Sequence, residues 1–448
     1  MTAEVETEVL IAGGGMVGLS LAVALADAGL AVMVVDRLDP AAMKEEAFDG
    51  RSSAIARGSQ QALSVLGLWP GMAEAASPIL DIRISDGHPS GRNGGSERRG
   101  GASSLFLHFS HRDTEEGPAA DKGIPPDIPP DIPPGIPLGH IVENTAIRRA
   151  CLARVKTLPK LDLRAPAELA SVARSAAGVK AVLGDGTTVS ARLLVAADGR
   201  GSAQRRAAGI AVTEVGYGQT GIVATVMHER PHNGVAHEHF LPSGPFALLP
   251  MTDAEDAEGR IVHRSSLVWT ERTNLVPAML ALDDKGFAAE LQRRFGDSLG
   301  QLALWSARRW SYPLSLLHAE RYIDQRLALV GDAAHGIHPI AGQGLNLGLR
   351  DVAALAESIV DARRLGLDIG SPSVLQRYQR WRRFDNMALI VATDSLNRLF
   401  SSDLPPLRLL RDLGLAAVNR LPPMKRFFMR HAMGLVGELP RLVKGEAL

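Results

Sequence analysis

The sequence has little cysteine, few aromatic residues and no surplus of charge of either sign. Cys151 is the only cysteine among 448 residues, which excludes an intramolecular disulfide and favours a reducing compartment. Lys plus Arg number 49, and so do Asp plus Glu, so the formal net charge is zero. The composition therefore gives no support for a nucleic-acid partner.

Long apolar runs are also absent. No segment reaches the roughly 18 residues that a membrane span needs. The first residues, MTAEVETEVL, are acidic and lead into an apolar run, unlike a signal peptide. We therefore expect a cytoplasmic protein. Its 46% hydrophobic and 22% charged residues are ordinary for a globular chain of two or three domains.

The first informative stretch is TEVLIAGGGMVGLSLAVALADAGLAVMVVDR. Its hydrophobic pattern predicts a strand, a helix and a second strand at residues 9–12, 19–28 and 32–35. The first strand is followed by GxGxxG, formed by Gly13, Gly15 and Gly18, and the second by Asp36 and Arg37. This order is typical of a dinucleotide-binding βαβ unit.

Each residue of this unit has a physical task. Gly13 permits the tight turn, Gly15 lets a pyrophosphate approach the backbone, and Gly18 lets helix and strand pack closely. The helix start offers free N–H groups to the phosphates. Asp36 is placed to bind ribose hydroxyls and disfavours a 2′-phosphate, so NAD or FAD fits this site and NADP does not.

Two further apolar runs end in glycine and a carboxylate. Asp198-Gly199 follows ARLLVAA, and Gly331-Asp332 follows RLALV. Taken singly, each pair is an ordinary turn signal. Together with the first turn, they predict three strand ends at one edge of an open α/β sheet, where such sheets bind cofactors.

The chain after Asp332 is dense in glycine and reads HPIAGQGLNLGLRD from His338 to Asp351. The three motifs in this order resemble those of the FAD-dependent aromatic hydroxylases. The stretch from His338 resembles, more narrowly, the signature of the ubiquinone-biosynthesis ring hydroxylases, and the likeness continues through residues 378–400. It covers nearly the whole chain except about residues 88–138.

The resemblance implies an extended FAD and assigns residues to it. Asp332 would hold the ribityl hydroxyls, Pro339 would line the isoalloxazine, and a glycine-rich helix start would face the flavin pyrimidine edge. The catalytic set is then Pro339, Gly344, Leu345 and Asn346. The cofactor-binding set is Gly13, Gly15, Gly18, Asp36, Arg37, Arg51, Asn144, Asp198, Gly331, Asp332, Gly342, Gly344, Leu345 and Asn346.

The implied reaction consumes NADH or NADPH and O₂ and hydroxylates a polyprenylated phenol through a flavin C4a-hydroperoxide. The resemblance implies that the nicotinamide cofactor binds transiently, without a dinucleotide-binding βαβ unit of its own. Two alternatives stay open: a related flavin enzyme, such as a halogenase or prenyl reductase, or a non-catalytic flavin-bearing member of a biosynthetic complex.

Several polar residues have two interpretations. Arg51 is either a cofactor contact or a solvated arginine, and Asn144 either a cofactor contact or a helix N-cap. His335 and His338 are either bases or residues that fix the turn by hydrogen bonds, and we favour the second. Tyr217 is a candidate for lining the substrate cavity. His237 and His239 share one face of an expected strand, but their spacing gives no basis for a metal site.

The expected fold class is α/β, a Rossmann-like FAD-binding domain with an inserted antiparallel-sheet substrate domain and a helical C-terminus. The FAD-binding domain takes residues 1–80, 140–208 and 316–366, the substrate domain 81–139 and 209–315, and the helical region 367–448. Within the Gly- and Pro-rich insert near 88–138, SSLFLHFSH is a possible strand. The Ile-Pro-Pro repeat at 124–136 is either a docking motif or an exposed insertion, and we favour the insertion.

The last part of the chain is basic and amphipathic. Between residues 408 and 444 there are eight Lys or Arg residues against Asp412 and Glu438. Either its helices only pack on the FAD-binding domain, or residues 404–448 also contact the inner face of a membrane or a ubiquinone-biosynthesis complex.

Overall fold

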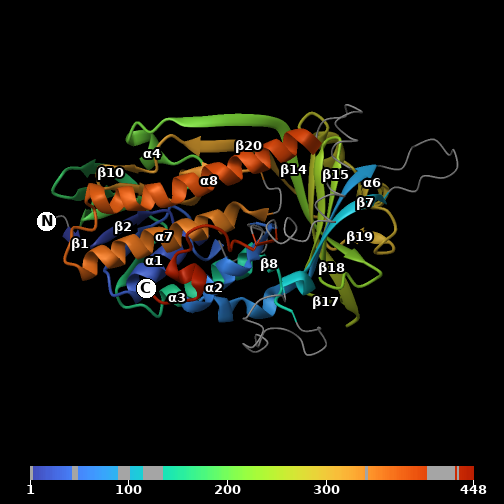
Figure 1. Ribbon diagram of the computed structural model, residues 1–448, viewed down its shortest axis with the longest axis horizontal. Coiled ribbons are helices and arrows are strands. Elements are labelled where there is room, and N and C mark those ends of the chain that lie inside the picture. The colour runs from blue at the N-terminus through green and yellow to red at the C-terminus, as the bar shows by residue number, and fades with distance from the viewer. Residues whose placement is uncertain are drawn as a thin grey trace.

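The computed structural model describes residues 4–42, 49–88, 101–114, 135–338, 342–400, 429–430 and 433–448. Figure 1 shows an elongated molecule, with helices α1, α7 and α8 beside the N-terminal strands at one end and the strands β14, β15 and β18 at the other. The combination of a parallel sheet, a second large sheet and C-terminal helices confirms the expected fold class.

The first large sheet has six strands in the order β21-β22-β13-β2-β3-β9. Its pairs are parallel except for β21 with β22. The four central strands are buried throughout and apolar, as a parallel sheet covered on both faces requires. The strands are β2 (Val9–Ala12), β3 (Val32–Val35), β9 (Leu161–Arg164), β13 (Leu193–Ala196), β21 (Ile323–Asp324) and β22 (Leu327–Leu329).

The carboxyl ends of these strands lie in one row. Ala12 is in register with both Val35 and Ala196, and Ala196 is in register with Leu329. The glycine turn and Asp36 follow these residues directly, and the Asp-Gly and Gly-Asp turns follow after one further residue. The predicted convergence of the strand ends at one sheet edge is therefore confirmed.

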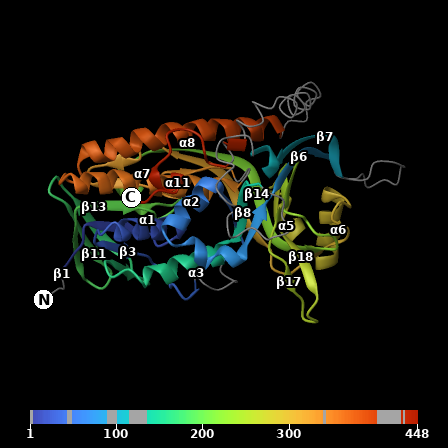
Figure 2. The ribbon, with the colours of Figure 1, turned by 60° about the horizontal axis from the view of Figure 1, so that its bottom comes forward.

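Helices and a smaller sheet complete this half of the molecule. Helix α1 contacts α3 and α7, and α7 contacts α8, which runs along it (Figure 2). A four-stranded sheet, β1-β12-β11-β10, joins the same hydrophobic core. The bounds are α1 (Met16–Asp27), α3 (Asn144–Val155), α7 (Gly344–Arg364), α8 (Pro372–Phe400), β1 (Glu4–Glu6), β10 (Leu169–Arg174), β11 (Val179–Leu183) and β12 (Thr188–Ala191).

The second large sheet has ten strands, with the main order β23-β20-β14-β18-β16-β15-β6-β7. It is antiparallel except for β15 with β6, which is a parallel pair that the sequence did not indicate. The possible strand in the insert is confirmed as part of β7. The strands are β6 (Asp81–His88), β7 (Gly101–Ser110), β14 (Val212–His228), β15 (Val235–Leu241), β16 (Gly244–Pro250), β17 (Ala254–Glu255), β18 (Ile261–Arg272), β19 (Leu302–Leu304), β20 (Trp310–Ala319) and β23 (His335–Gly336).

The remaining elements join the two halves or cover them. A further sheet has three strands in the order β4-β8-β5. Helix α2 follows β4 in the chain, and α3 follows β8. Helix α6 packs its buried face on the core of the ten-stranded sheet. The bounds are β4 (Ser52–Ala56), β5 (Ala76–Ile79), β8 (Gly139–Glu143), α2 (Arg57–Val65), α4 (Ala203–Ala207), α5 (Val276–Leu280), α6 (Asp284–Phe295) and α11 (Arg441–Lys444).

Some expectations need correction or lie outside the described residues. The first helix begins at Met16 rather than Leu19, because Gly15 itself is the N-cap. Pro339 and most of the Ile-Pro-Pro repeat lie outside the described ranges. The expected division into a discontinuous FAD-binding domain, a substrate domain and a C-terminal helical region stays a prediction.

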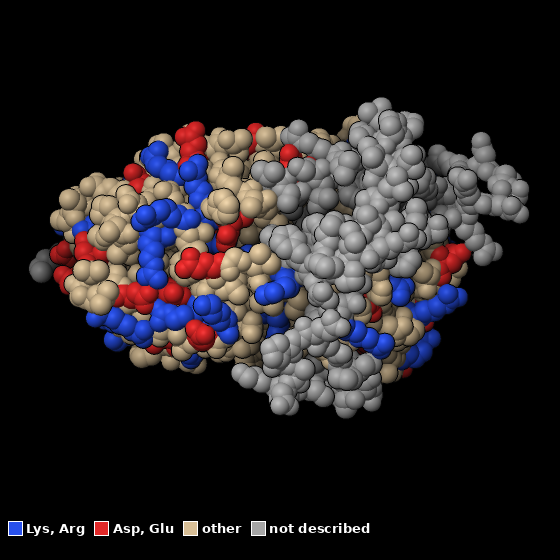
Figure 3. All heavy atoms as spheres, in the orientation of Figure 1, with Lys and Arg blue, Asp and Glu red and all other residues tan. Residues whose placement is uncertain are grey.

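The surface agrees with the balanced composition. Lys, Arg, Asp and Glu are intermixed over the described part of the face drawn in Figure 3. Among the described residues, no helix is long and apolar enough to cross a membrane.

Candidate active site

The first turn is built by glycines with different roles. Gly13 has φ +106°, and a Cβ there would lie 2.4 Å from the Ala197 carbonyl oxygen. A Cβ on Gly18 would lie 2.0 Å from the Gly13 carbonyl oxygen. The fold itself therefore requires both glycines. Gly15 is different, since a Cβ there would meet nothing within 4 Å.

The start of α1 suits an anion. Gly15 is its N-cap, no side chain caps the helix, and the first turn holds no acidic residue. The free N–H groups and the positive end of the helix dipole are thus left for a ligand. The open space at Gly15, which a side chain would fill, fits a pyrophosphate.

Asp36 is held at the rim of this turn. Its Oδ2 accepts a hydrogen bond from Gly14 N at 2.5 Å, and its Oδ1 accepts one from Leu38 N at 2.7 Å. The carboxylate is therefore fixed where a ribose would follow the pyrophosphate. Arg37 is exposed beside it.

The Asp-Gly turn is tied to the Gly-Asp turn by an arginine that sequence reasoning missed. Asp198 Oδ2 accepts from Ala203 N at 2.8 Å in the first turn of α4, whose N-cap is Ser202. Arg205, from α4, donates to the carbonyl oxygens of Ala333 at 2.8 Å and Arg200 at 2.7 Å. Arg205 lies in the run GSAQRR after the Asp-Gly pair, which is the only sequence signal for it.

A buried carboxylate holds the Gly-Asp turn. Asp351 Oδ2 accepts from Gly331 N at 3.0 Å and contacts His335 Nε2, while Arg382 Nε donates to Asp351 Oδ1 at 2.9 Å. The side chains of Asp351 and Arg382 are both 0% exposed. The hydrogen-bonding role favoured for His335 is thus confirmed. Asp332 itself follows Gly331 in a short 3₁₀ turn, Gly331–Ala333.

The pKa of Asp351 reflects this environment. Burial alone would raise it, but the ion pairs and hydrogen bonds with His335 and Arg382 outweigh burial and lower the pKa to about 2. The carboxylate is therefore charged at neutral pH and keeps its partners in place.

The start of α7 is anchored to β4. Asn346 Oδ1 accepts from Ala56 N at 2.9 Å, and its Nδ2 donates to Ala54 O at 2.8 Å. Its side chain thus binds backbone, and only its main chain is left to meet a cofactor. Leu345, beside it, is partly buried against the main core. Gly342 has φ +61°, with Ala54 at 2.9 Å from a Cβ placed there.

At most glycines of this stretch, the space that a side chain would occupy is already filled by neighbouring atoms. A Cβ on Gly348 would lie 2.6 Å from Val17, and one on Gly336 would lie 2.3 Å from the Arg200 guanidinium. Gly331 has φ +57°. Only at Gly344 would a Cβ meet nothing within 4 Å. Close approach of a flavin thus offers an explanation for Gly344, whereas the fold explains the others.

Arg51 and Asn144 are brought together by Asp49, a buried residue that sequence reasoning missed. Asp49 accepts from Arg51 Nε at 2.9 Å, from Asn144 Nδ2 at 3.1 Å and from Arg148. Burial raises the pKa of Asp49, but Arg51 and Arg148 hold it well below its usual range. The triplet Asp-Gly-Arg at 49–51, repeated at 198–200, was the available signal.

These contacts bear on the alternatives for Arg51 and Asn144, and a cofactor contact by either residue stays a prediction. Arg51 lies over the Tyr312 ring, 4.6 Å from its centroid, and its side chain is 47% exposed. The N-cap of α3 is Glu143 and not Asn144. Asn144 therefore has no capping role, and its side chain serves the Asp49 cluster.

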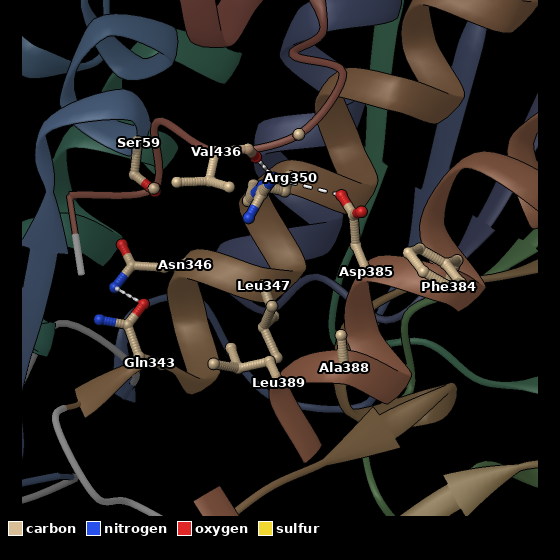
Figure 4. Close-up of a pocket in the computed structure, with 12 residues that line it drawn as sticks. Ser59, Gln343, Asn346, Leu347, Arg350, Phe384, Asp385, Ala388, Leu389 and Val436 are labelled. Carbon is tan, nitrogen blue, oxygen red and sulfur yellow. Dashed lines mark hydrogen bonds and ion pairs between the residues drawn. The ribbon is translucent and has the colours of Figure 1, made fainter. Parts of the chain in front are cut away.

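A cavity of about 160 Å³ opens between α7, α8 and residues 434–437 (Figure 4). Arg350 crosses one side of it and donates to Asp385 Oδ2 at 3.2 Å and to Val436 O at 2.9 Å. Leu347 and Leu389 face each other at its other side and also belong to an apolar cluster. That cluster consists of Val215, Tyr217, Leu316, Ile337, Leu347, Leu389 and Ile390.

The histidines of β15 are both buried. His237 and His239 have ring centroids 6.4 Å apart, and burial lowers their pKa values to about 3 and 4. Within the described ranges, no group of three or more His, Cys, Asp or Glu residues is arranged to hold a metal ion.

A βαβ unit whose glycine turn is open to a ligand is typical of a dinucleotide-binding protein. The sequence pattern described as "FAD binding domain" matches residues 6–391. The chain belongs to this family, and within it to the FAD-dependent ring hydroxylases of ubiquinone biosynthesis.

Several known proteins are similar to this chain over nearly its whole length. Ubiquinone hydroxylase UbiL of Rhodospirillum rubrum is 49% identical over 100% of this chain and 95% of its own. The 3-demethoxyubiquinol 3-hydroxylase of Escherichia coli is 34% identical, covering 96% and 99%. The structure of p-nitrophenol 4-monooxygenase from Pseudomonas putida matches in fold, with TM-score 0.74 and 18% identity over 97% and 99%.

Proposed function

We propose that this protein hydroxylates the aromatic ring of a polyprenylated phenol in ubiquinone biosynthesis, with FAD, NADH or NADPH, and O₂. The observation that carries the proposal is the row of strand ends in register at one sheet edge, together with two helix starts, at Gly15 and Gly344, where an added Cβ would meet nothing within 4 Å. The two ubiquinone-pathway hydroxylases named above supply the substrate class.

The chain's own residues would position the cofactor in two places. The start of α1 would bind the pyrophosphate and Asp36 the ribose hydroxyls. Asp332 and the start of α7 would bind the ribityl chain and the pyrimidine edge, where backbone N–H groups stabilise negative charge. When bound there, FAD would supply the redox chemistry, with NAD(P)H as the reductant and O₂ as the oxidant, one oxygen atom going to the ring and the other to water.

The cavity between α7 and α8 gives the apolar tail a place to bind. It borders Gln343 and Asn346 at the start of α7, and much of its lining is apolar. Phe384 lines it and is 78% exposed on α8. We infer that the polyprenyl tail lies along this cavity while the ring reaches the helix start.

Replacing Ala388 with glutamate tests the tail site. A carboxylate in the cavity should raise KM about tenfold for a long-chain prenylated phenol, which corresponds to losing the burial of about two CH₂ groups. KM for the same phenol without its tail should change less than twofold. Gln376→Glu adds the same charge to an exposed position of α8 and should change neither value. Equal effects on both substrates would contradict the tail assignment.

The activity itself is tested with purified, FAD-loaded protein. We expect NAD(P)H oxidation and O₂ uptake that a prenylated phenol stimulates, with a product heavier by one oxygen atom. A halogenated or reduced product would favour a related flavin enzyme. Bound FAD without phenol-dependent O₂ uptake would favour a non-catalytic role in a biosynthetic complex.

Membrane or complex contact through residues 404–448 stays a prediction, because residues 401–428 lie outside the described ranges. Part of the basic charge near the end of the chain is already used within the fold. Arg441 N donates to Glu357 at 2.7 Å, and its guanidinium pairs with Asp361 on α7. Leu442 and Val443 of α11 are buried.

A further inference from the structure

His338 is a buried histidine with one unused ring nitrogen. It is 1% exposed, and its Nε2 lies 3.3 Å from Gln219 Oε1 on β14. Its Nδ1 is buried and has no hydrogen-bond partner among the described residues. Tyr217 packs edge-on against the imidazole, with ring centroids 5.1 Å apart.

The hydrogen bonds of Gln219 assign the tautomer of this histidine. Gln219 Nε2 donates to Ser243 O at 2.8 Å, so the amide oxygen is the atom that faces His338. An amide oxygen only accepts, so the proton of the imidazole is on Nε2. Nδ1 therefore carries a lone pair and is a hydrogen-bond acceptor.

The charge state supports this assignment. Burial lowers the pKa of His338 to about 4, although the Asp394 carboxylate on α8 opposes the shift. The ring is neutral at neutral pH. It is a poor proton carrier at this pKa but a good acceptor.

The surroundings of His338 are apolar. Its neighbours Ile337 and Tyr217 belong to the apolar cluster that also contains Leu347 and Leu389 of the cavity. A buried acceptor in such a setting is costly unless a partner satisfies it.

We propose that His338 Nδ1 accepts a hydrogen bond from the ring hydroxyl of the substrate and selects phenols over rings that lack this group. The inference rests on the proposed function. The hydrogen bond leaves more negative charge on the phenol oxygen. This raises electron density at the ring carbons ortho and para to the hydroxyl, where an electrophilic oxygen attacks. His338 is thus a specificity-determining residue that also prepares the ring.

The experiment compares the binding of two ligands to FAD-loaded protein, followed by the change in flavin absorbance. One is a short-chain prenylated phenol and the other is the same molecule without its hydroxyl. The wild type should bind the phenol about tenfold more tightly, as expected for one hydrogen bond in a buried site. His338→Leu should bind both equally. His338→Asn, which keeps an acceptor near the Nδ1 position, should retain part of the preference.

His239→Leu is the matched control. His239 is also buried, with an Nδ1 that has no partner among the described residues, but it lies on β15 outside the candidate site. This variant should keep the full preference for the phenol. A preference that persists in His338→Leu would overturn the inference, and so would a wild type that binds both ligands equally, even if His338→Leu fails to fold. A preserved preference without hydroxylated product would instead reject the proposed function.

Discussion

Gly15→Val is expected to yield a folded protein that no longer retains FAD. A Cβ at Gly15 meets nothing within 4 Å, and the backbone there has an ordinary φ of −70°. The added side chain therefore leaves the fold intact but occupies the space proposed for the pyrophosphate. Losing two or more hydrogen bonds between backbone N–H groups and phosphate should weaken FAD binding at least about a hundredfold.

The measurement is FAD content after purification, with the unfolding temperature of the FAD-free protein as the test of folding. The wild type and Gly15→Val should unfold at the same temperature without FAD. Gly344→Val should behave in the same way, because its Cβ is also unopposed. Gly18→Val is the contrasting variant, since its Cβ would lie 2.0 Å from Gly13 O and the fold itself should fail. Normal FAD content in Gly15→Val would contradict the proposed pyrophosphate position.

Arg382→Met is expected to lower the free energy of unfolding by about 3–5 kcal/mol, because it leaves Asp351 as a buried charge without its main partner. Both side chains are fully buried, and Asp351 also holds Gly331 and His335. Denaturant unfolding of the FAD-free protein measures the change.

Arg377→Met is the control on the same helix. Arg377 is 45% exposed and pairs with Glu357 and Asp361. Exposed ion pairs contribute little, so its loss should cost less than about 1 kcal/mol. A cost for Arg382→Met as small as this would show that the buried pair does not support the Gly-Asp turn.

The same cluster predicts how stability depends on pH. The pKa of Asp351 is about 2 in the folded protein, because His335 and Arg382 outweigh the effect of burial, and near 3.9 in an unfolded chain. A lowered pKa means that the stabilisation is fully present above about pH 4. It is lost as the pH falls from about 4 towards 2. Arg382→Met should flatten this part of the stability profile.

The local parts of the fold were predictable from the sequence. Strands β2 and β3 match the predicted residues 9–12 and 32–35, because an apolar run bounded by glycine and a carboxylate is a local pattern. The strand in the insert was also recognisable from its alternating residues. The parallel pairing of β6 with β15 was not, because it joins segments about 150 residues apart.

The details of the site depended on contacts that a single sequence does not show. The Asp49 carboxylate binds both Arg51 and Asn144, although Asn144 lies 95 residues further along the chain. Gly342 and Gly348 are glycines because Ala54 and Val17 lie against them. The sequence suggested that a flavin accounts for the whole glycine-rich stretch, but packing against Ala54 and Val17 accounts for Gly342 and Gly348, and Gly331 has a positive φ of +57°.

The most direct test of the central claim is the position of FAD in a crystal structure of the loaded protein. We predict density with the adenosine ribose within hydrogen-bonding distance of Asp36 and the isoalloxazine against the backbone N–H groups that begin α7 at Gly344. Density that leaves either end of this path empty, or FAD bound elsewhere on the chain, would contradict the account.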